Sequence, residues 1–359
     1  MARYLDPTGT KFWEIERDGA TIVRRSGAVG SRGRAQNRTF ATALLARFSE
    51  RTFIGFKTHT ERYVLASPAP ALTDDFPFDD DARLVHADVL QQRGDPLGEL
   101  ITMQHANVDA TALIDANAQA WFGDIADARD QFRFAWRLGR LSRVEVRPDR
   151  RIDELLPDVP HVYKLPTLIA ALLELPIARM LDELVIGSAG TPDYQSTMQT
   201  IVEHAPPTLR RLVIDAEGRR LTADAWLYAM QFPNLEEFQC DLNLASQGLR
   251  HIANATWPKL KTLSFAMHGS QDTVPLAPDD TAEAIAELAP IFAGRGVSAL
   301  TQLEIWTPTP TPLAYAMTTL APQFTEVVIR SKRAIDPDAE RALPPCARFD
   351  QQPLYTMRR

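Results

Sequence analysis

The sequence predicts an α+β protein: a small antiparallel sheet with one helix, then a helical hairpin, then an α/β solenoid. Three observations lead to this prediction. The first 65 residues alternate apolar and polar positions around a hairpin turn, and a central stretch has helical periodicity between an acidic start and a glycine end. A six-residue apolar pattern then recurs through the second half of the chain.

The composition is that of a globular protein, with 45% hydrophobic and 24% charged residues over 359 positions. No run of 18 apolar residues occurs, so we expect neither a membrane span nor a membrane partner. The N-terminus lacks the apolar core of a signal peptide, which favours the cytoplasm. Of the two cysteines, Cys240 lies in a predicted strand, and a buried thiol is expected there rather than a disulfide.

The predicted organisation has five parts. They are a domain over residues 1–65, a proline-rich linker over 66–78, a helical domain over 79–140, the solenoid over 141–335 and a tail over 336–359. Charge is divided unevenly among them: residues 1–65 hold 12 Lys+Arg and 6 Asp+Glu, a balance of +6, which leaves 27 against 40, or −13, for the rest. A basic module therefore precedes an acidic body.

In the first module, Lys11–Glu16 and Ala20–Arg25 are predicted strands joined at Asp18-Gly19, a dipeptide typical of hairpins. Ala43–Phe53 has helical periodicity, and Tyr63–Leu65 is expected to close the sheet. This order of elements, with KFWEIE, the DG turn, a glycine-bearing third strand and TFATALLARF, resembles a WGR domain, a module of some poly(ADP-ribose) polymerases and of many bacterial proteins.

The resemblance implies a possible nucleic-acid site. In DNA-binding members the Trp of the motif packs against a sugar at a DNA end and the Arg makes polar contacts, whereas this chain has Ser26, Gly27 and Ala28 at the matching positions. The residues that remain for DNA or RNA are Arg24, Arg25, Gly27, Arg32, Arg34 and Arg38. A solvated basic face without a ligand is the alternative. A contiguous arginine patch would favour nucleic acid, and dispersed arginines would favour a protein contact.

The segment 79–104 reads DDDARLVHADVLQQRGDPLGELITMQ, which predicts two helices joined at Gly94-Asp95. It resembles the short repeat-companion domain of bacterial multidomain proteins, whose pattern is RLVYADWLEERGDPRGEFIRLQ, with His86 in place of Tyr and Val89 in place of Trp. That family implies no catalytic activity. From Ala110 to Leu138 the helical pattern is expected to continue through a group of aromatic residues, predicted to be core.

The recurring pattern places apolar residues at the first, fourth and sixth positions. It occurs as LDELVIG from Leu181, LRRLVID from Leu209, LEEFQCDLN from Leu235, LKTLSFA from Leu260, LTQLEIW from Leu300 and, more weakly, FTEVVIR from Phe324. The starts lie 28, 26, 25, 40 and 24 residues apart. The last two apolar positions point to one side of a short strand, and stacked units bury that side together. The array resembles degenerate leucine-rich repeats; ordinary αβ units with coincidental leucines are the alternative.

Polar residues beside the strand leucines are expected on the concave face of such a solenoid, the surface that solenoids use for protein recognition. The candidate protein-binding residues are Arg211, Glu237, Lys261, Glu304 and Trp306. Trp306 and Tyr315 are the candidate anchors, although Trp306 also suits a cover for the last turn. The loop Thr307–Pro312 and the insertion Asp272–Glu283 are expected to project from the solenoid edge.

Searches for reaction chemistry find no motif. The seven histidines never pair at i, i+4, and the chain has no CxxC, GxSxG, Walker loop or kinase signature. We therefore predict no catalytic residue, no metal, no cofactor and no small-molecule substrate. The favoured hypothesis is a non-enzymatic interaction or scaffold protein that binds a protein partner through the concave face, with the WGR-like module as a second contact. The alternative is DNA-end binding through the basic module.

Overall fold

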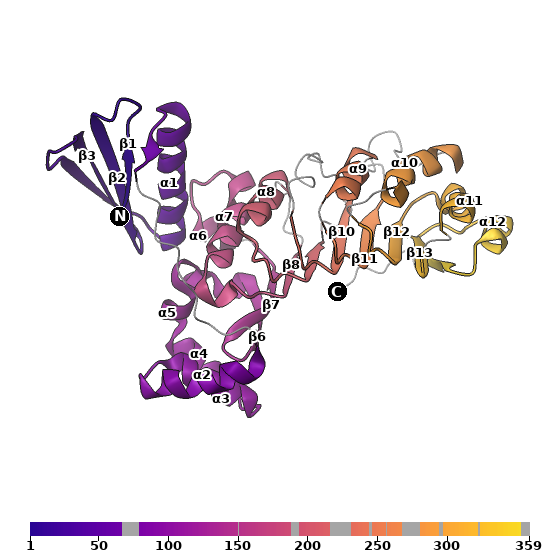
Figure 1. The fold of residues 1–359 in the computed structure, drawn as a ribbon, viewed down its shortest axis with the longest axis horizontal. Coiled ribbons are helices and arrows are strands. Elements are labelled where there is room, and N and C mark those ends of the chain that lie inside the picture. Colours follow the sequence, from indigo (N-terminus) through magenta and orange to yellow (C-terminus); the bar gives the residue numbers. More distant parts are fainter. Residues whose placement is uncertain are drawn as a thin grey trace. The chain divides into compact units, whose positions relative to one another are not determined.

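The computed structural model describes residues 1–66, 79–149, 151–187, 194–215, 231–243, 246–255, 257–267, 281–293, 297–321 and 324–352. The chain divides into two compact units. The first comprises residues 1–141 and 148–178, and the second comprises residues 142–147 and 179–359. The fold is mixed α+β, with one antiparallel sheet and one mostly parallel sheet (Figure 1).

The antiparallel sheet is built from the first 65 residues. Its strands are β1 (Ala2–Leu5), β2 (Lys11–Asp18), β3 (Thr21–Ala28), β4 (Arg34–Thr39) and β5 (Val64–Leu65), in the order β4-β3-β2-β1-β5. The predicted hairpin is confirmed, because Asp18 pairs with Thr21 and Gly19 has a φ of 52°. The expected closing strand is confirmed as well, because β5 pairs with β1.

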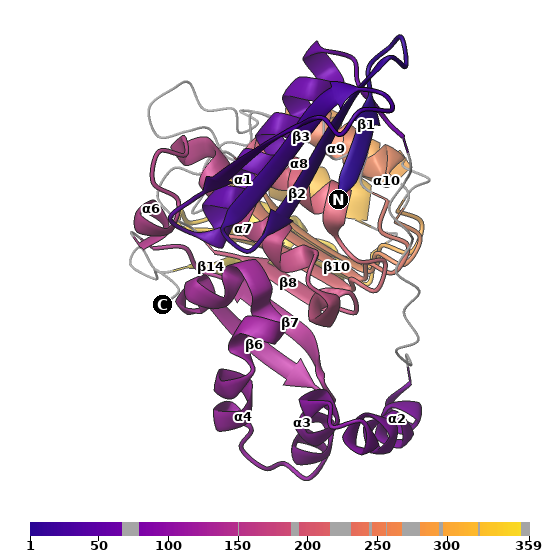
Figure 2. The same cartoon turned by 90° about the vertical axis from the view of Figure 1, so that its left-hand side faces the viewer.

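Helix α1 (Ala43–Gly55) covers one face of this sheet (Figure 2) and continues into a π-helical turn, η1 (Phe56–Thr60). It begins where the Thr42 hydroxyl accepts a hydrogen bond of 3.1 Å from the backbone N–H of Leu45. The core beneath it consists of Tyr4, Trp13, Ile15, Ile22 and Ala46. The predicted sheet with one helix is therefore present.

The helical hairpin also follows the prediction. Helices α2 (Asp80–Gln92) and α3 (Pro96–His105) pack on each other, and each starts on an aspartate side chain that accepts a backbone N–H. Helices α4 (Thr111–Ala116) and α5 (Ala118–Phe122) and the 3-10 helix η2 (Gly123–Gln131) follow.

The aromatic stretch after η2 is a strand, where the periodicity had predicted a continuing helix. Strand β6 (Phe132–Arg137) has Phe132, Phe134 and Trp136 on one side and exposed residues between them. Their spacing of two is the period of a strand, and this period prevails over the helical one. Leu138 and Gly139, both left-handed, then form a two-residue turn into β7 (Arg140–Val146).

A cluster of ion pairs joins the N-terminal module to later helices of the first unit. Arg17 contacts Glu50 at 2.8 Å and Asp124 at 2.6 Å, and Arg47 contacts Asp124 at 3.0 Å. Arg47 also pairs with Glu174, which follows helix α7 (His161–Leu173). The Arg47 side chain is 9% exposed, so this is a largely buried cluster. Helix α6 (Arg151–Leu155) and the short 3-10 helix η3 (Pro176–Ala178) complete the unit.

The mostly parallel sheet contains nine strands in the order β14-β13-β12-β11-β10-β9-β8-β7-β6. Its remaining strands are β8 (Glu183–Ile186), β9 (Arg211–Ile214), β10 (Glu237–Asn243), β11 (Thr262–Ala266), β12 (Gln302–Trp306), β13 (Glu326–Ser331) and β14 (Ala347–Gln351). From β7 to β14 each strand is parallel to its neighbour.

The six sequence repeats are structurally equivalent in this sheet. The residue two positions after each repeat start occupies the same register position, in the order Glu183, Arg211, Glu237, Thr262, Gln302 and Glu326. The helices after the strands are α8 (Tyr194–His204), α9 (Ser246–Asn254), α10 (Thr281–Ala293) and α11 (Pro310–Leu320). They lie on one side of the strands (Figures 1 and 2).

Two expectations near the C-terminus need correction. The projecting loop predicted at Thr307–Pro312 is partly helical, because α11 begins at Pro310, and the first turn of a helix accepts proline without losing a hydrogen bond. The segment expected to be a tail holds α12 (Pro337–Ala342) and β14, which pairs with β13. The sheet therefore continues beyond residue 335. Most of the predicted insertion Asp272–Glu283 lies outside the described residues.

None of the helices in the described part of the chain is both long and apolar enough to cross a lipid bilayer.

Candidate interaction surfaces

The two faces of the parallel sheet differ in chemistry. The residues that face the helices are apolar and at most 1% exposed; they include Leu184, Leu212, Phe238, Leu263, Leu303 and Val327. Because side chains alternate along a strand, the residues between them point to the opposite side. We call that side of β7–β14 the open face. Its charged and aromatic members are Arg143, Glu145, Glu183, Arg211, Glu237, Glu304, Trp306, Glu326, Arg330, Arg348 and Asp350.

A ladder of alternating charge crosses the open face over four strands. Arg143 contacts Glu183 at 3.2 Å, Glu183 also contacts Arg211, and Arg211 contacts Glu237 at 2.9 Å. Partial burial disfavours the charged form of Arg211, but the hydrogen bonds and charges of Glu237 and Glu183 outweigh this and raise the pKa of Arg211. The structure thus brings two of the predicted protein-binding residues, Arg211 and Glu237, into direct contact.

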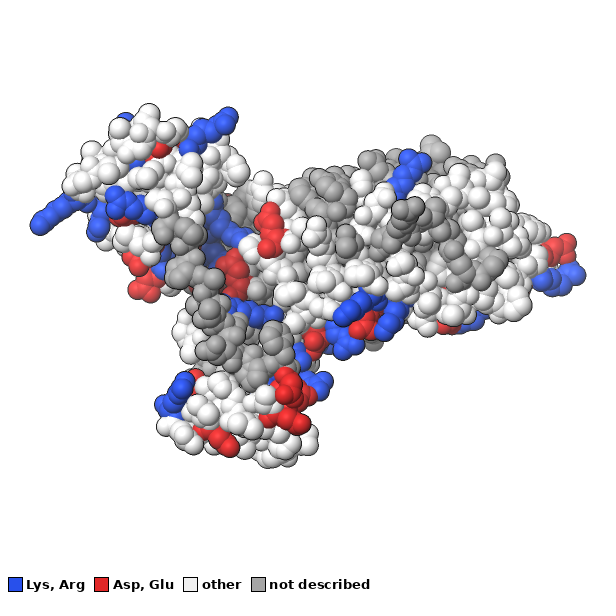
Figure 3. All heavy atoms as spheres, viewed as in Figure 1, with Lys and Arg blue, Asp and Glu red and all other residues white. Residues whose placement is uncertain are grey.

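A second charge cluster precedes the strands. The Glu236 carboxylate accepts hydrogen bonds from Lys261 Nζ at 2.9 Å and Arg210 Nε at 2.8 Å. These two bonds, that of Lys261 first, lower the pKa of Glu236. The predicted residue Lys261 therefore lies beside the sheet, where it pairs with Glu236. Acidic and basic side chains are also intermixed along the border below β10 and β11 in Figure 3.

The third group lies at the end of β12. The indole N–H of Trp306 donates to Glu304 at 2.9 Å, and the Arg330 guanidinium contacts Glu304 at 2.8 Å and Asp350 at 2.5 Å. The Arg330 Cζ also lies 5.4 Å from the centre of the Trp306 ring, within cation–π range. Trp306 is half-buried and oriented by its neighbours.

Sequence reasoning identified Glu304 and Trp306 but missed Arg330 and Asp350. Arg330 is the last residue of the weakest repeat, and Asp350 lies in the segment expected to be a tail. One signal was present: Arg330 stands at the same offset in its repeat as Trp306 does in the preceding one.

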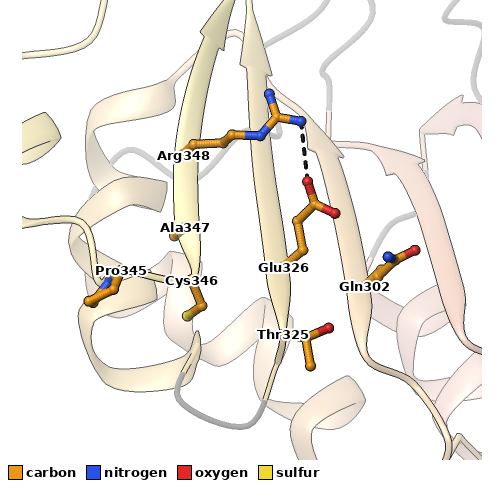
Figure 4. A pocket seen from close by; sticks show the side chains of 7 residues that line it. All are labelled: Gln302, Thr325, Glu326, Pro345, Cys346, Ala347 and Arg348. Carbon is orange, nitrogen blue, oxygen red and sulfur yellow. Dashed lines mark hydrogen bonds and ion pairs between the residues drawn. The ribbon is translucent and has the colours of Figure 1, made fainter.

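A hollow of about 370 Å³ lies at the start of the last strands (Figure 4). Its lining residues are Gln302, Thr325, Glu326, Pro345, Cys346, Ala347 and Arg348. Arg348 pairs with Glu326 at 3.2 Å, and the Cys346 thiol donates to the Ala321 carbonyl at 3.5 Å. Cys240 is the buried thiol that the sequence predicted, and Cys346 is partly buried.

The candidate nucleic-acid residues lie on both sides of the antiparallel sheet. Arg38 is opposite the core residue Ile22, so Arg38, Arg34 and Arg24 share the side of helix α1. Arg24 lies 4.3 Å over the Phe53 ring and donates to Gln36 at 3.2 Å.

Arg25 points to the other side of this sheet, where it lies 3.8 Å from Glu14. Arg32 lies in the exposed turn between β3 and β4. Basic side chains project from separate points of this module in Figure 3. The arginines are therefore dispersed.

Gly27 and Gly33 have a steric role in the β3–β4 hairpin. A Cβ atom on Gly27 would lie 2.8 Å from Gly33 Cα, and one on Gly33 would lie 2.6 Å from the Phe12 ring. Gly33 also has a φ of 65°, which favours glycine. Gly27, the glycine that the sequence analysis singled out, thus fits a close backbone approach.

Within the described residues, no group of three or more His, Cys, Asp or Glu side chains is arranged to hold a metal ion.

No protein-family model matches this sequence. The curated proteins likewise include no significant match to it. A solved structure of a Bacteroides fragilis protein aligns with 98% of this chain and 97% of its own, at 13% identity and a TM-score of 0.32. That similarity is too low to support an argument about fold or function.

Proposed function

We propose that this chain is a non-enzymatic interaction protein that binds a protein partner across the open face. The observation behind the proposal is the one-sided placement of the helices. Parallel sheets normally carry helices on both faces, and their strands are then apolar on both sides. Here the described helices α8–α11 lie on one side, and the other side combines the charge ladder and Trp306 with the buried Val185, Val213 and Val328. A partner protein would complete the second layer.

The chemistry of the open face indicates what kind of partner fits. Arg143, Glu183, Arg211 and Glu237 alternate in sign, so the surface complements a protein that presents both charges. Exposed ion pairs contribute about 0–1 kcal/mol each, so exchanging them for pairs with a partner costs little. Trp306 is the proposed anchor, because oriented, half-buried tryptophans contribute strongly to interface energy.

We further propose that residues 141–335 form a leucine-rich-repeat-like solenoid and that residues 1–65 form a WGR-like module that adds a second contact. The equivalent register of six repeats and the one-sided helices support the first assignment. The order of four antiparallel strands, one helix and a closing strand supports the second.

Site-specific photo-crosslinking in cells tests the proposed face. A crosslinking amino acid at Gln302, exposed on the open face, is compared with one at Thr319, exposed on helix α11. We expect a discrete protein adduct from Gln302 and none of the same mass from Thr319. Once the partner has been identified and purified, Trp306→Ala is expected to weaken binding by about tenfold or more, and Tyr315→Ala on α11 to leave it unchanged. Equal adducts from both positions, or unchanged binding by Trp306→Ala, would contradict the proposal.

A second candidate function, DNA or RNA binding by the first module, is favoured by one observation. Among the described residues, Arg24, Arg32, Arg34 and Arg38 have no carboxylate partner, unlike the arginines of the open-face ladder. Their dispersal over the module favours a protein contact instead, by the criterion stated above. The loss of a stacking ring at the motif position removes about 1–3 kcal/mol of nucleic-acid affinity.

Salt titration of the whole chain against duplex DNA with a 5′-phosphate end distinguishes these functions. Replacing Arg32, Arg34 and Arg38 by Gln is compared with replacing Arg143, Arg210 and Lys261 by Gln. The measured quantity is the slope of the logarithm of the binding constant against the logarithm of the salt concentration. If the module binds phosphates, the first triple variant makes this slope shallower by about 0.9 for each lost phosphate contact, and the second does not. No binding by wild-type protein at low salt would exclude this function.

A further inference from the structure

Strand β14 is an edge strand of the parallel sheet as the structure describes it. The N–H of Val327 donates to the Cys346 carbonyl, and the N–H of Gln352 donates to the Ser331 carbonyl, at 2.8 Å each. In a parallel pair of strands, this hydrogen-bond pattern means that the backbone N–H and C=O groups of Arg348 and Asp350 point toward β13. Those of Phe349 and Gln351 therefore point away from the sheet, and among the described strands none pairs with them.

Strand β14 carries two side chains of opposite charge, one on each side of its central residue, Phe349. Arg348 and Asp350 flank Phe349 and share the open face. If a second copy of β14 pairs antiparallel with its centre at Phe349, Arg348 stands opposite Asp350 of the copy, and Asp350 stands opposite its Arg348. This register also overlaps the whole strand, because Ala347 then meets Gln351.

We propose that β14 is a homodimer interface, through which the parallel sheet continues into a second copy of this chain. The outward N–H and C=O of the two Phe349 residues form a reciprocal hydrogen-bonded pair. The flanking Arg348 and Asp350 then occupy non-hydrogen-bonded positions, where Cα atoms lie about 4.5 Å apart and side chains are closest. The half-buried Phe349 rings meet across the two-fold axis on the helix side.

The ion pairs within one chain are compatible with the ion pairs proposed across the two-fold axis. Arg348 pairs with Glu326 at 3.2 Å, and Asp350 pairs with Arg330 at 2.5 Å. Joining two copies therefore creates the order Glu326, Arg348, Asp350 of the copy and Arg330 of the copy, with signs that alternate throughout. The Arg348 side chain is 57% exposed in the single chain and is free to take a second carboxylate.

The edge strand β4 is a useful contrast, because a second copy does not fit there. All six of its residues are exposed, and the bond from Phe40 N–H to the Ala20 carbonyl directs the backbone groups of Ala35, Asn37 and Thr39 outward. The charged side chains of this strand, Arg34 and Arg38, are both basic and share one face. An antiparallel copy would add two more arginines to that face, and the like charges would repel.

The proposed dimer does not depend on the protein partner of the open face. Sedimentation analysis of the full chain over a range of concentrations tests it. We expect a monomer–dimer equilibrium in the wild type. Arg348→Glu places two carboxylates opposite each other twice per dimer, and Asp350→Arg does the same with two guanidinium groups. Each variant alone is expected to dissociate about tenfold more readily or worse. An equimolar mixture of the two variants restores opposite charges at both positions and is expected to dimerise like the wild type.

Glu326→Gln is the matched control, because it removes the in-chain partner of Arg348 without changing the proposed interface pairs. It is expected to leave the dimer intact, and circular dichroism checks that every variant is folded. Rescue by mixing supports the proposal, since a fold defect is not repaired by a second defective chain. A wild-type monomer at all concentrations, a dimer insensitive to both variants, or no rescue on mixing would each overturn it.

Discussion

The two sheets of this protein handle charge in opposite ways. In the parallel sheet, the guanidinium groups of Arg143, Arg211 and Arg330 lie against carboxylates from neighbouring strands, on a face that solvent reaches. In the antiparallel sheet, Arg34 and Arg38 have no carboxylate among the described residues. The arginines of the first surface are therefore paired, whereas edge strand β4 of the second sheet carries positive charge that no described carboxylate balances.

The difference separates charge that stabilises the fold from charge that is available for binding. The cluster of Arg17, Arg47 and Asp124 is largely buried, so its ion pairs depend on the folded arrangement of the chain. The open-face ladder is exposed, so its pairs contribute little to stability and can be exchanged for pairs with a partner.

The largest effect is expected from the helix side of the parallel sheet. Leu263 is fully buried, and Leu263→Ala is predicted to lower the free energy of unfolding by about 2–5 kcal/mol, because it leaves a cavity beneath the helices. The control is Thr262→Ala, one residue earlier and half-buried on the open face, for which we expect less than about 1 kcal/mol. Urea unfolding measures both. Equal losses would show that the two faces are not distinct.

In the antiparallel sheet, Gly33→Ala is predicted to cost about 3 kcal/mol. Its Cβ would lie 2.6 Å from the Phe12 ring and 2.9 Å from the Ser26 carbonyl, and the φ of 65° adds strain. Gly30→Ala is the matched control, since its φ is also positive, at 89°, but nothing lies within 4 Å of the added atom. It should cost about 1 kcal/mol. Thermal unfolding of the two variants separates the cost of the positive φ, which both share, from the cost of the steric overlap, which only Gly33→Ala has. Equal decreases in melting temperature would refute the close-approach explanation.

Arg47→Ala is predicted to cost about 2 kcal/mol. This is less than for an isolated buried pair, because Asp124 keeps Arg17 and Glu174 keeps Arg51. Arg211→Ala, which removes a ladder residue with two carboxylate partners, is expected to cost under about 1 kcal/mol, since its side chain is 35% exposed. Chemical denaturation of the two variants tests whether burial decides the difference. A larger loss from Arg211→Ala would reverse the comparison.

The smallest effect concerns pH. The pKa of Glu236 is lowered in the folded chain by Lys261 and Arg210, so its contribution is present at neutral pH and is lost as pH falls below its ordinary value of 4.5. Glu236→Gln should therefore cost a few tenths of a kcal/mol at pH 7 and almost nothing at pH 3. Unfolding curves at both pH values measure this difference. A loss that grows as pH falls would have the wrong sign for this pairing.

Much of the fold was predictable, because its signals are local. The alternation in Lys11–Glu16, the Asp18-Gly19 turn and the acidic start of α2 each report on neighbouring residues in the chain. The repeats were equally readable, since six segments with one spacing occupy one register in the sheet. The helix predicted over Phe132 to Trp136 was wrong, because a short run of aromatic residues is compatible with both the helical and the strand period. Strand β6 was therefore missed.

The candidate surfaces were less predictable, because they depend on contacts distant in sequence. Sequence reasoning placed Arg211, Glu237, Glu304 and Trp306 beside the repeat leucines, and the structure places them on the open face. Lys261 lies beside the sheet instead, because it precedes its strand. Strand β14 has no repeat pattern in ARFDQ, so neither the edge nor the pairing of Asp350 with Arg330 was foreseen.

The sequence by itself determined most element types, the repeat register and the division into a basic module and an acidic body, because periodicity, turn residues and composition act over short distances. The tertiary structure alone decided which charges meet and which edges stay open. Arg25 lies near Glu14, whereas Arg34 has no such partner among the described residues, and Arg348 shares a strand face with Asp350. Strand order and register set these distances. In the parallel sheet no local pattern contains that information, since helices separate most of its consecutive strands.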